Sequence, residues 1–392
     1  MSLAIVRRAA LAVAIIALVG WFVLGVTHPV DLAVYRAGVV VWWHGGDLYG
    51  PLPGTSLPFI YPPFSVVLLA PFTLSPYVAS VLTIAALVFV IVLVLRSLDV
   101  RPTGVLVGVV LSVALVLEPV RETLYFGQIN VLLMALVAAD CLVRQPKWPR
   151  GLLVGVAAAI KLTPLVFVLF FLLRGDRRAA ITTGLSFLGA TAIGFLLSWQ
   201  NSLRFWTEQV LFGTQSRGMS NPINQSLKVM LVRLGSDQGW PWLLLAVAVI
   251  AITVVSVRQA QHPTWALGLN ALGGLLISPV SYSHHWVWAV PILLTAAVTA
   301  WRTRAWSAIV ITAVGTVLFV SAPHWWWAPD APWTTVHLLV GNAYVIAAVL
   351  VLGVEVTRWR AGGPVDPGRR VWRTWAAGRL RRSWRRQAPR TG

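Results

Sequence analysis

Long apolar runs recur along almost the whole chain, and they constrain its fold more than any other feature. Hydrophobic residues make up 58% of the 392 positions and charged residues only 11%, whereas about a quarter of a soluble domain is charged. So much apolar surface cannot be enclosed in one core, and the lipid bilayer is the extended solvent that matches it. The pattern predicts an all-α polytopic membrane protein.

Ten of these runs approach the roughly 17–25 residues that cross a bilayer as a helix. They lie at residues 9–26, 76–95, 103–117, 123–143, 179–198, 240–257, 265–279, 285–300, 305–322 and 336–354. We therefore expect about ten membrane spans, with boundaries uncertain by a few residues.

A further apolar segment, residues 151–173, has basic residues on both sides. If both flanks are cytoplasmic, the segment must enter the membrane and return. Lys161 and Pro164 lie at its middle, and an arm of about ten residues, at about 1.5 Å per residue, cannot cross about 30 Å of hydrocarbon. We expect a re-entrant helical hairpin whose broken turn is buried in protein or lines a cavity.

The basic residues predict the sidedness of the protein. Residues 358–392 hold 11 Arg against one Asp, and the other Lys and Arg gather in short loops, whereas seven of the 12 acids fall in the opposite loops. This bias predicts a multi-pass plasma-membrane protein with both termini in the cytoplasm. We divide the chain into a transmembrane catalytic domain, residues 1–357, and an Arg/Trp-rich cytoplasmic tail, residues 358–392. No basic recognition module is present, which argues against nucleic acid as a partner.

The first extracytoplasmic loop carries a candidate catalytic acid. From Val30 to Trp43, apolar residues recur at helical spacing, which predicts a helix lying along the membrane interface with Trp42 at headgroup depth. Asp31 is placed at the outer membrane surface, where a general base for a reaction between lipid-anchored partners would stand. From the residues alone, a helix N-cap or a topology-marking surface acid is the other explanation of Asp31.

Two further segments place polar side chains near the membrane. Arg121 stands beside two acids in EPVRETLYFGQINVLLM, residues 118–134, and is either paired with them or part of an anion site, since a guanidinium suits phosphate. Gln128 and Asn130 enter the apolar run, where such side chains most often hydrogen-bond between helices. Lys161 either balances a buried acid or binds a lipid phosphate.

Two adjacent histidines occur in SPVSYSHHWVW, residues 278–288. Neighbours on a helix point about 100° apart, so His284 and His285 cannot easily form a two-His metal site. Either one of them donates a hydrogen bond to a phosphate or sugar, or the pair belongs to the aromatic belt. Metal, nucleotide and serine-hydrolase motifs are absent from the sequence, so we expect no metal and no cofactor.

Six ordered motifs together resemble glycosyltransferase family 87, a branch of the GT-C superfamily of membrane transferases that use polyprenyl-phosphate sugars. They are VDLAVYRAG at 30–38, LPFIYPPF at 57–64, EPVRETLYFGQINVLLM at 118–134, GLLVGVAAAIKLTPLVF at 151–167, NQSLKVMLVRL at 224–234 and SPVSYSHHWVW at 278–288. The resemblance covers roughly residues 28–290 and is greatest to the phosphatidylinositol-mannoside α-1,2-mannosyltransferases. It implies the GT-C glycosyltransferase fold.

The resemblance also implies a reaction. The donor is polyprenyl-phosphate-mannose, the acceptor is a glycolipid of phosphatidylinositol-mannoside or lipomannan type, and transfer is inverting at the extracytoplasmic face. The family's catalytic Asp falls on Asp31, with Glu118 the next candidate base. By motif position, the donor phosphate and sugar are bound by Lys161, Arg121, His284, His285, Tyr35, Tyr61, Asn224 and Gln225.

Other functions remain open from the sequence. The resemblance also allows an arabinofuranosyltransferase, because some paralogues in the family transfer arabinofuranose from a polyprenyl phosphate. A lipid or sugar transporter would also use a broken hairpin with a buried lysine, although the polar motifs here gather on one face rather than at the midplane. An assembly role is the third alternative.

Overall fold

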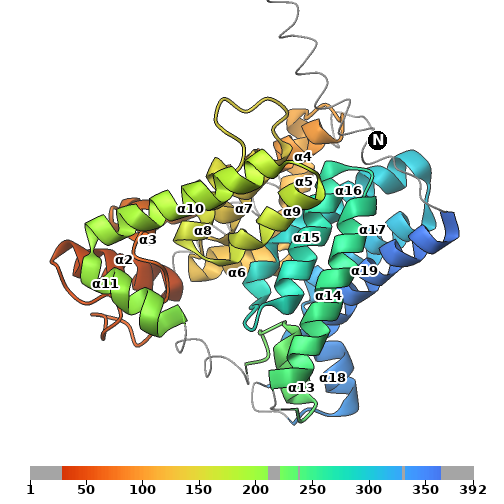
Figure 1. Cartoon of the computed structure of the whole chain (residues 1–392). Helices are drawn as coiled ribbons and strands as arrows, with labels where there is room; N and C mark the ends of the chain where they lie inside the picture. The colour runs from red at the N-terminus through yellow and green to blue at the C-terminus, as the bar shows by residue number, and fades with distance from the viewer. Residues whose placement is uncertain (1–28, 211–220, 237–238, 329–331, 363–392) are drawn as a thin grey trace, which may run out of the picture.

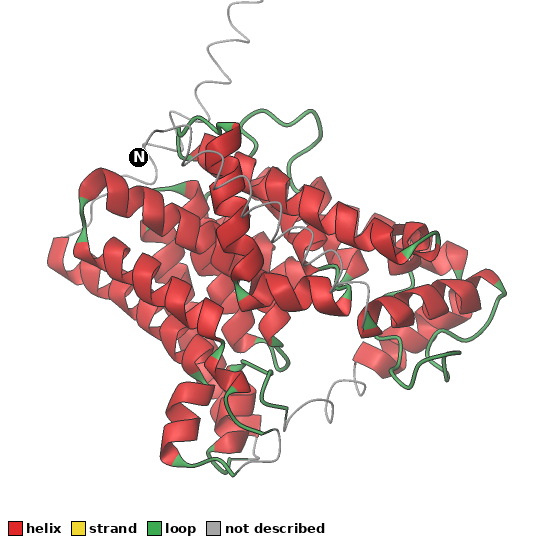
Figure 2. Cartoon of the chain, turned by 180° about the vertical axis from the view of Figure 1, so that it is seen from behind, coloured by secondary structure: helices red, strands yellow, loops and turns green. Residues whose placement is uncertain are grey.

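The computed structural model describes residues 29–210, 221–236, 239–328 and 332–362. Within these ranges the regular structure is helical, apart from one isolated antiparallel bridge between Asn224 and Tyr282 (Figure 2). The expected first span, 9–26, and most of the expected tail lie outside the described residues.

The helices follow one another with short connections. In the first half they are α2 (Val30–Trp43), α3 (Ser65–Leu69), η1 (Ala70–Thr73), α4 (Pro76–Ser97), α5 (Gly104–Val116), α6 (Glu118–Phe126), α7 (Asn130–Leu142), α8 (Leu152–Ile160), η2 (Thr163–Phe167), α9 (Val168–Leu173), α10 (Arg177–Leu197) and α11 (Trp199–Arg204). In the second half they are η3 (Phe205–Gln209), α13 (Leu227–Arg233), α14 (Gly239–Gln259), α15 (Pro263–Ile277), η4 (Ser283–Trp288), α16 (Ala289–Thr303), α17 (Trp306–Ser321), η5 (Pro323–Trp325), α18 (Thr335–Gly341) and α19 (Ala343–Gly362).

Every described apolar run is helical, but fewer helices than ten have the length of a full span. In the described part, α4, α10, α14 and a segment of 20 residues containing α17 are long and apolar enough to cross a bilayer. Two bent pairs, α5 with α6 at 75° and α18 with α19 at 63°, raise the number to six. The run at 123–143, expected as one span, is divided at Gly127–Ile129 into α6 and α7. The ten-span count is therefore not confirmed.

The expected break at Lys161 is present. Helix α8 ends at Ile160, Lys161 has extended backbone angles of −149° and 127°, and η2 begins at Thr163. Helix α8 packs against α7 and α10, and a Cβ on Gly155 would stand 2.5 Å from the Thr183 carbonyl oxygen. Close contact between α8 and α10 therefore requires glycine at this position. The re-entrant path through a membrane stays a prediction.

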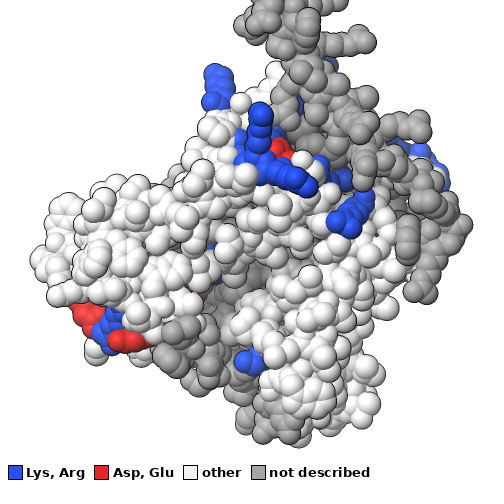
Figure 3. All heavy atoms as spheres, in the orientation of Figure 1, with Lys and Arg blue, Asp and Glu red and all other residues white. Residues whose placement is uncertain are grey.

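Two groups of short helices project from the central bundle (Figure 1). One contains α2, α3 and α11, and the other contains α13 and α18. Helix α2 packs against α3, η1 and α6, whereas α11 contacts α10 and α3 contacts α8, so several helices join the first group to the bundle. Lys and Arg side chains gather at the end of the molecule away from α13 and α18 (Figure 3). This distribution matches the loops that the sequence assigns to the cytoplasm.

Candidate active site

Asp31 lies in the first turn of α2, which begins at Val30 as expected. The residue before the helix is Pro29, and no side chain caps the helix end, so capping does not account for Asp31. Burial raises the pKa of the Asp31 carboxyl above its ordinary value, and a hydrogen bond with Gln128 and the charge of Lys161 oppose that rise. Asp31 is therefore a half-buried acid near a cation, and not a free surface charge.

Two tyrosines and Gln128 form a hydrogen-bonded group beside Asp31. The Tyr35 hydroxyl donates to Oε1 of Gln128 at 2.8 Å and lies 2.8 Å from the Tyr61 hydroxyl. Burial raises the pKa of both phenols, so each keeps its proton and can donate. Because Oε1 accepts from a tyrosine, the amide nitrogen of Gln128 is directed to other partners, among which Asp31 is an acceptor.

The turn after α6 places Gln128 against α2. Gly127 has φ of +71°, and the next amide, of Gln128, bonds back to the Thr123 carbonyl. A Cβ on Gly127 would stand 2.6 Å from the Leu32 Cβ. Glycine is therefore required at position 127 for two reasons: the backbone is left-handed at this helix C-terminus, and α2 approaches closely.

Lys161 stands at the centre of a second hydrogen-bonded group. Its Nζ donates to Oδ1 of Asn130 at 3.0 Å and lies 3.2 Å from Nε2 of His285. Nζ also lies 5.6 Å from the centre of the Tyr61 ring, within the range of a cation–π contact. The break at Lys161, the start of α7 and the η4 turn are thereby joined at one point.

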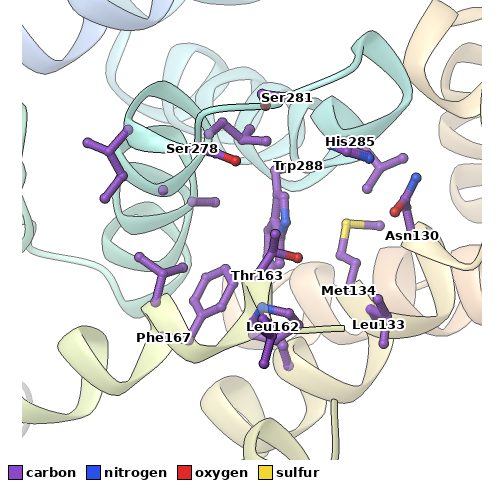
Figure 4. A pocket seen from close by; sticks show the side chains of 18 of the residues that line it. Asn130, Leu133, Met134, Leu162, Thr163, Phe167, Ser278, Ser281, His285 and Trp288 are labelled. Carbon is purple, nitrogen blue, oxygen red and sulfur yellow. The ribbon is translucent and has the colours of Figure 1, made fainter. Parts of the chain in front are cut away.

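An apolar cavity of about 370 Å³ opens beside this group. Asn130 and His285 line it together with residues of α7, η2 and α15, most of them apolar. Figure 4 shows Asn130, His285 and Met134 on one side of the cavity and Ser278 and Phe167 on the other. A cation and an imidazole at one end of an apolar hollow suit an anionic headgroup joined to a lipid chain.

The comparisons with known proteins agree with this chemistry. The model of glycosyltransferase family 87 matches residues 59–279. The chain is 39% identical to the polyprenol-phosphate-mannose-dependent alpha-(1-2)-phosphatidylinositol mannoside mannosyltransferase of Mycolicibacterium smegmatis, over 86% of each chain. It is 36% identical to the protein of the same name from Mycobacterium tuberculosis, over 86% of this chain and 88% of that one.

A third relative carries a narrower name. It is the M. tuberculosis polyprenol-phosphate-mannose-dependent alpha-(1-2)-phosphatidylinositol pentamannoside mannosyltransferase, 34% identical over 83% of this chain and 80% of that one. No solved structure matches the chain significantly. The chain belongs to glycosyltransferase family 87. The resemblance inferred from the six motifs is thereby confirmed.

The match to family 87 spans part of the site. It includes Tyr61, Gln128, Asn130 and Lys161 and ends before the η4 turn. His284 in that turn is buried, and neither ring nitrogen has a hydrogen-bond partner within the described residues. Its backbone carbonyl accepts from Asn130 and Thr123 at 3.0 and 3.2 Å.

Three other expected residues of this family 87 chain have local partners. Arg121 pairs with the adjacent Glu122 at 3.3 Å between Nε and Oε1. Asn224 is fully buried, and its Oδ1 accepts from the Ser281 amide at 3.0 Å. Gln225 is also fully buried and donates to the Gly341 carbonyl at 2.8 Å. The Asn224 and Gln225 contacts connect the loop before α13 to the loop before η4 and to α18.

The second candidate base, Glu118, is occupied by other side chains. It is fully buried at the start of α6. Oε1 accepts from Nε1 of Trp325 at 3.1 Å and lies 3.3 Å from Nε2 of His324, and Oε2 accepts from the Tyr344 hydroxyl at 3.1 Å. This carboxylate joins α6 to the C-terminal helices, so we assign it a structural role.

Gln128 and Asn130 are closer to the candidate site than their sequence pattern predicts. The pattern predicts hydrogen bonds between helices for both residues, and both do bond between elements. Their partners, however, are the candidate site residues Tyr35 and Lys161. The sequence does contain a sign of this role. Two carboxamide side chains, at 128 and 130, flank one turn, so that turn can bring both of them to neighbouring parts of the same site. Across the described residues, no group of three or more His, Cys, Asp or Glu could hold a metal ion.

Proposed function

We propose that this chain transfers mannose from polyprenyl-phosphate-mannose to a phosphatidylinositol-mannoside or lipomannan acceptor, with inversion, forming an α-1,2-mannoside. The observation that carries the proposal is the position of Lys161. It interacts electrostatically with Asp31 and contacts Asn130 and His285, which line an apolar cavity. The names of the relatives supply the donor and the linkage.

The donor phosphate binds at Lys161 and His285. The ammonium lies 3.2 Å from Nε2 of His285, so a phosphate beside the pair would accept from the ammonium and from the Nδ1–H on the other side of the ring. The prenyl chain enters the cavity lined by Met134, Phe167 and Trp288, because burial of apolar chain is favourable there. As the phosphate leaves, these two donors stabilise its developing charge.

Asp31 is the general base. It accepts the proton of the acceptor hydroxyl while that oxygen forms a bond to the anomeric carbon of mannose. The bond from that carbon to the phosphate oxygen breaks on the opposite side, and its electron pair leaves with polyprenyl phosphate. A raised carboxyl pKa favours this proton transfer, because the acid formed at Asp31 is then more stable.

The reaction takes place at the extracytoplasmic face. Basic residues gather in the loops at 96–101 and 144–150, and basic loops mark the cytoplasmic side, whereas the site motifs follow the loops that are assigned to the opposite face. Acceptor choice follows the two relatives at 39% and 36% identity, which are named for phosphatidylinositol mannoside, and not the relative named for the pentamannoside.

Mannose transfer by purified protein in lipid nanodiscs tests this function. The donor is synthetic polyprenyl-phosphate-mannose, offered with phosphatidylinositol mannosides of increasing size. We expect transfer by the wild type and loss of at least about a thousandfold in Asp31→Asn, which removes the base. Asp47→Asn is the matched control, because Asp47 is a half-exposed acid paired with Arg204 outside the site.

Three outcomes count against the proposal in different ways. Full activity of Asp31→Asn would remove the base from this position. Transfer from an arabinofuranosyl donor alone would assign the paralogous activity. No transfer by folded wild type from either donor would favour a transporter, which lipid-flipping assays in vesicles would then show.

A further inference from the structure

The side-chain amide of Asn130 connects Lys161 to the η4 turn that carries His284 and His285. Asn130, the first residue of α7, is 7% exposed. Its Nδ2 donates to the carbonyl oxygen of His284 at 3.0 Å, and its Oδ1 accepts from Nζ of Lys161 at 3.0 Å. A carboxamide supplies one donor and one acceptor on a rigid plane, which neither an acid nor an apolar residue does.

The Lys161 contact also fixes the chemistry of His285. A protonated lysine has three donors and no acceptor. The His285 Nε2, at 3.2 Å from that ammonium, is therefore an acceptor, and the neutral ring carries its proton on Nδ1. His285 lines the cavity, so its Nδ1–H is the donor available to a ligand there.

We propose that Asn130 is a positioning residue for the donor phosphate. It fixes the Lys161 ammonium relative to the η4 backbone, so that the ammonium and the Nδ1–H of His285 can bind the same phosphate. This inference rests on the proposed function, because the ligand that both donors would bind is the polyprenyl phosphate. Asp31, His284 and the Tyr61 ring also face Lys161.

A purely structural amide would behave differently. Asn270 in α15 provides the comparison, because it is fully buried and donates to the Val166 carbonyl at 3.2 Å. It donates one bond to a backbone carbonyl, as Asn130 does, but its described hydrogen bond does not involve Lys161 or His285. Loss of the Asn270 amide therefore measures the cost of a buried backbone contact alone.

The test compares Asn130→Ala and Asn130→Asp with Asn270→Ala in full-length protein in nanodiscs. Binding of unreactive polyprenyl phosphate, KM for the donor, KM for the acceptor and thermal stability are measured. Asn130→Asp keeps the size of the side chain, removes the donor to His284 and adds a negative charge beside Lys161. We expect both Asn130 variants to bind polyprenyl phosphate about tenfold more weakly or worse, with acceptor KM unchanged.

A spectroscopic measurement tests the arrangement of Asn130, Lys161 and His285 without an activity assay. With ¹⁵N-labelled histidine, the wild type should show His285 with an unprotonated Nε2 at neutral pH, and Asn130→Ala should lose that signature. If Asn130→Ala does not fold, the isosteric Asn130→Asp variant decides the same question.

The outcomes are distinct. Wild-type affinity for polyprenyl phosphate in both Asn130 variants would overturn the inference, as would an equal loss in Asn270→Ala. A wild type that shows the His285 signature but binds no polyprenyl phosphate would overturn the proposed function, and the assigned ligand with it. Weaker phosphate binding in the Asn130 variants alone supports both.

Discussion

The hydroxyl oxygens of Tyr35 and Tyr61 lie 2.8 Å apart, and Tyr35 also donates to Gln128 at 2.8 Å. The two tyrosines come from α2 and from the loop that follows it, and Gln128 comes from the turn between α6 and α7. This contact holds α2, which carries Asp31, against the bundle that carries Lys161. The relative position of the proposed base and the cation therefore depends on side chains that need not touch substrate.

Removal of one hydroxyl should weaken this connection. In Tyr35→Phe, Oε1 of Gln128 loses its 2.8 Å donor, and the amide is no longer held toward Asp31. We expect kcat/KM to fall about tenfold, which corresponds to roughly 1.4 kcal/mol. Tyr77→Phe in α4, where the side chain is 47% exposed, is the control. Equal kinetics in the two variants would show that the hydrogen bond does not position Asp31.

The pH dependence of transfer should report Asp31. Burial raises the pKa of this carboxyl from its ordinary value of 3.8, so the base is lost at a higher pH than for a free acid. We expect kcat/KM to fall on the acid side with a midpoint above 3.8, about tenfold per pH unit below it. Measured in nanodiscs with saturating acceptor, a midpoint at or below the ordinary value would exclude Asp31 as the titrating base.

The same shift predicts the stability of Asp31→Asn. Because the carboxyl pKa of Asp31 is higher in the folded state than in the unfolded chain, ionisation of Asp31 above pH 3.8 lowers the free energy of unfolding. The neutral amide removes that cost. We expect the Tm of Asp31→Asn at pH 7 to equal or exceed that of the wild type. A marked fall in Tm would mean that its loss of activity reflects misfolding.

Glu118 should show the opposite behaviour. Glu118→Gln replaces a buried carboxylate that His324, Trp325 and Tyr344 surround. We expect a loss of stability of about 1–3 kcal/mol, read as a lower Tm, with transfer per folded molecule largely retained. A variant with wild-type Tm and no turnover would make Glu118 the base and remove Asp31 from that role.

Gly127 should be intolerant of any side chain. Gly127→Ala adds strain at φ of +71° and also a contact of 2.6 Å with Leu32. Gly54→Ala is matched, because Gly54 has φ of +75° and open space around it. The control should lose only about 1 kcal/mol, whereas Gly127→Ala should also reduce kcat by displacing Asp31. Equal kcat in both would show that α2 adapts to the added methyl group.

The cavity should select for the lipid chain of the donor. Leu275 lines it and is half-buried, so Leu275→Trp would fill the space with limited cost to folding. We expect KM for a long-chain donor to rise roughly tenfold, because a few methylenes lose their burial, while a short-chain donor is unaffected. Leu243→Trp, on an α14 side chain that is 55% exposed, is the control. A uniform effect on both donors would place the chain elsewhere.

Much of the site could be named from the sequence, because its residues lie in short motifs. Asp31, Tyr35, Tyr61, Lys161 and His285 were all predicted, and the structure brings them together. The prediction was less complete for residue types that bind either a ligand or a neighbouring helix, such as arginine, asparagine and glutamine. An arginine beside acids, or amides in an apolar run, has the same sequence pattern whether it binds a ligand or a neighbouring helix.

The sequence by itself determined the membrane environment, the helical class, the family and the break at Lys161, because each follows from hydropathy or from short-range spacing. Only the tertiary structure distinguishes the two candidate acids. Glu118 is hydrogen-bonded by other side chains, whereas Asp31 lies near the Lys161 cation. The tertiary structure also revealed that Asn130 joins Lys161 to the η4 turn. These distinctions depend on contacts between residues separated by tens to hundreds of positions, and no local pattern encodes the distance between them.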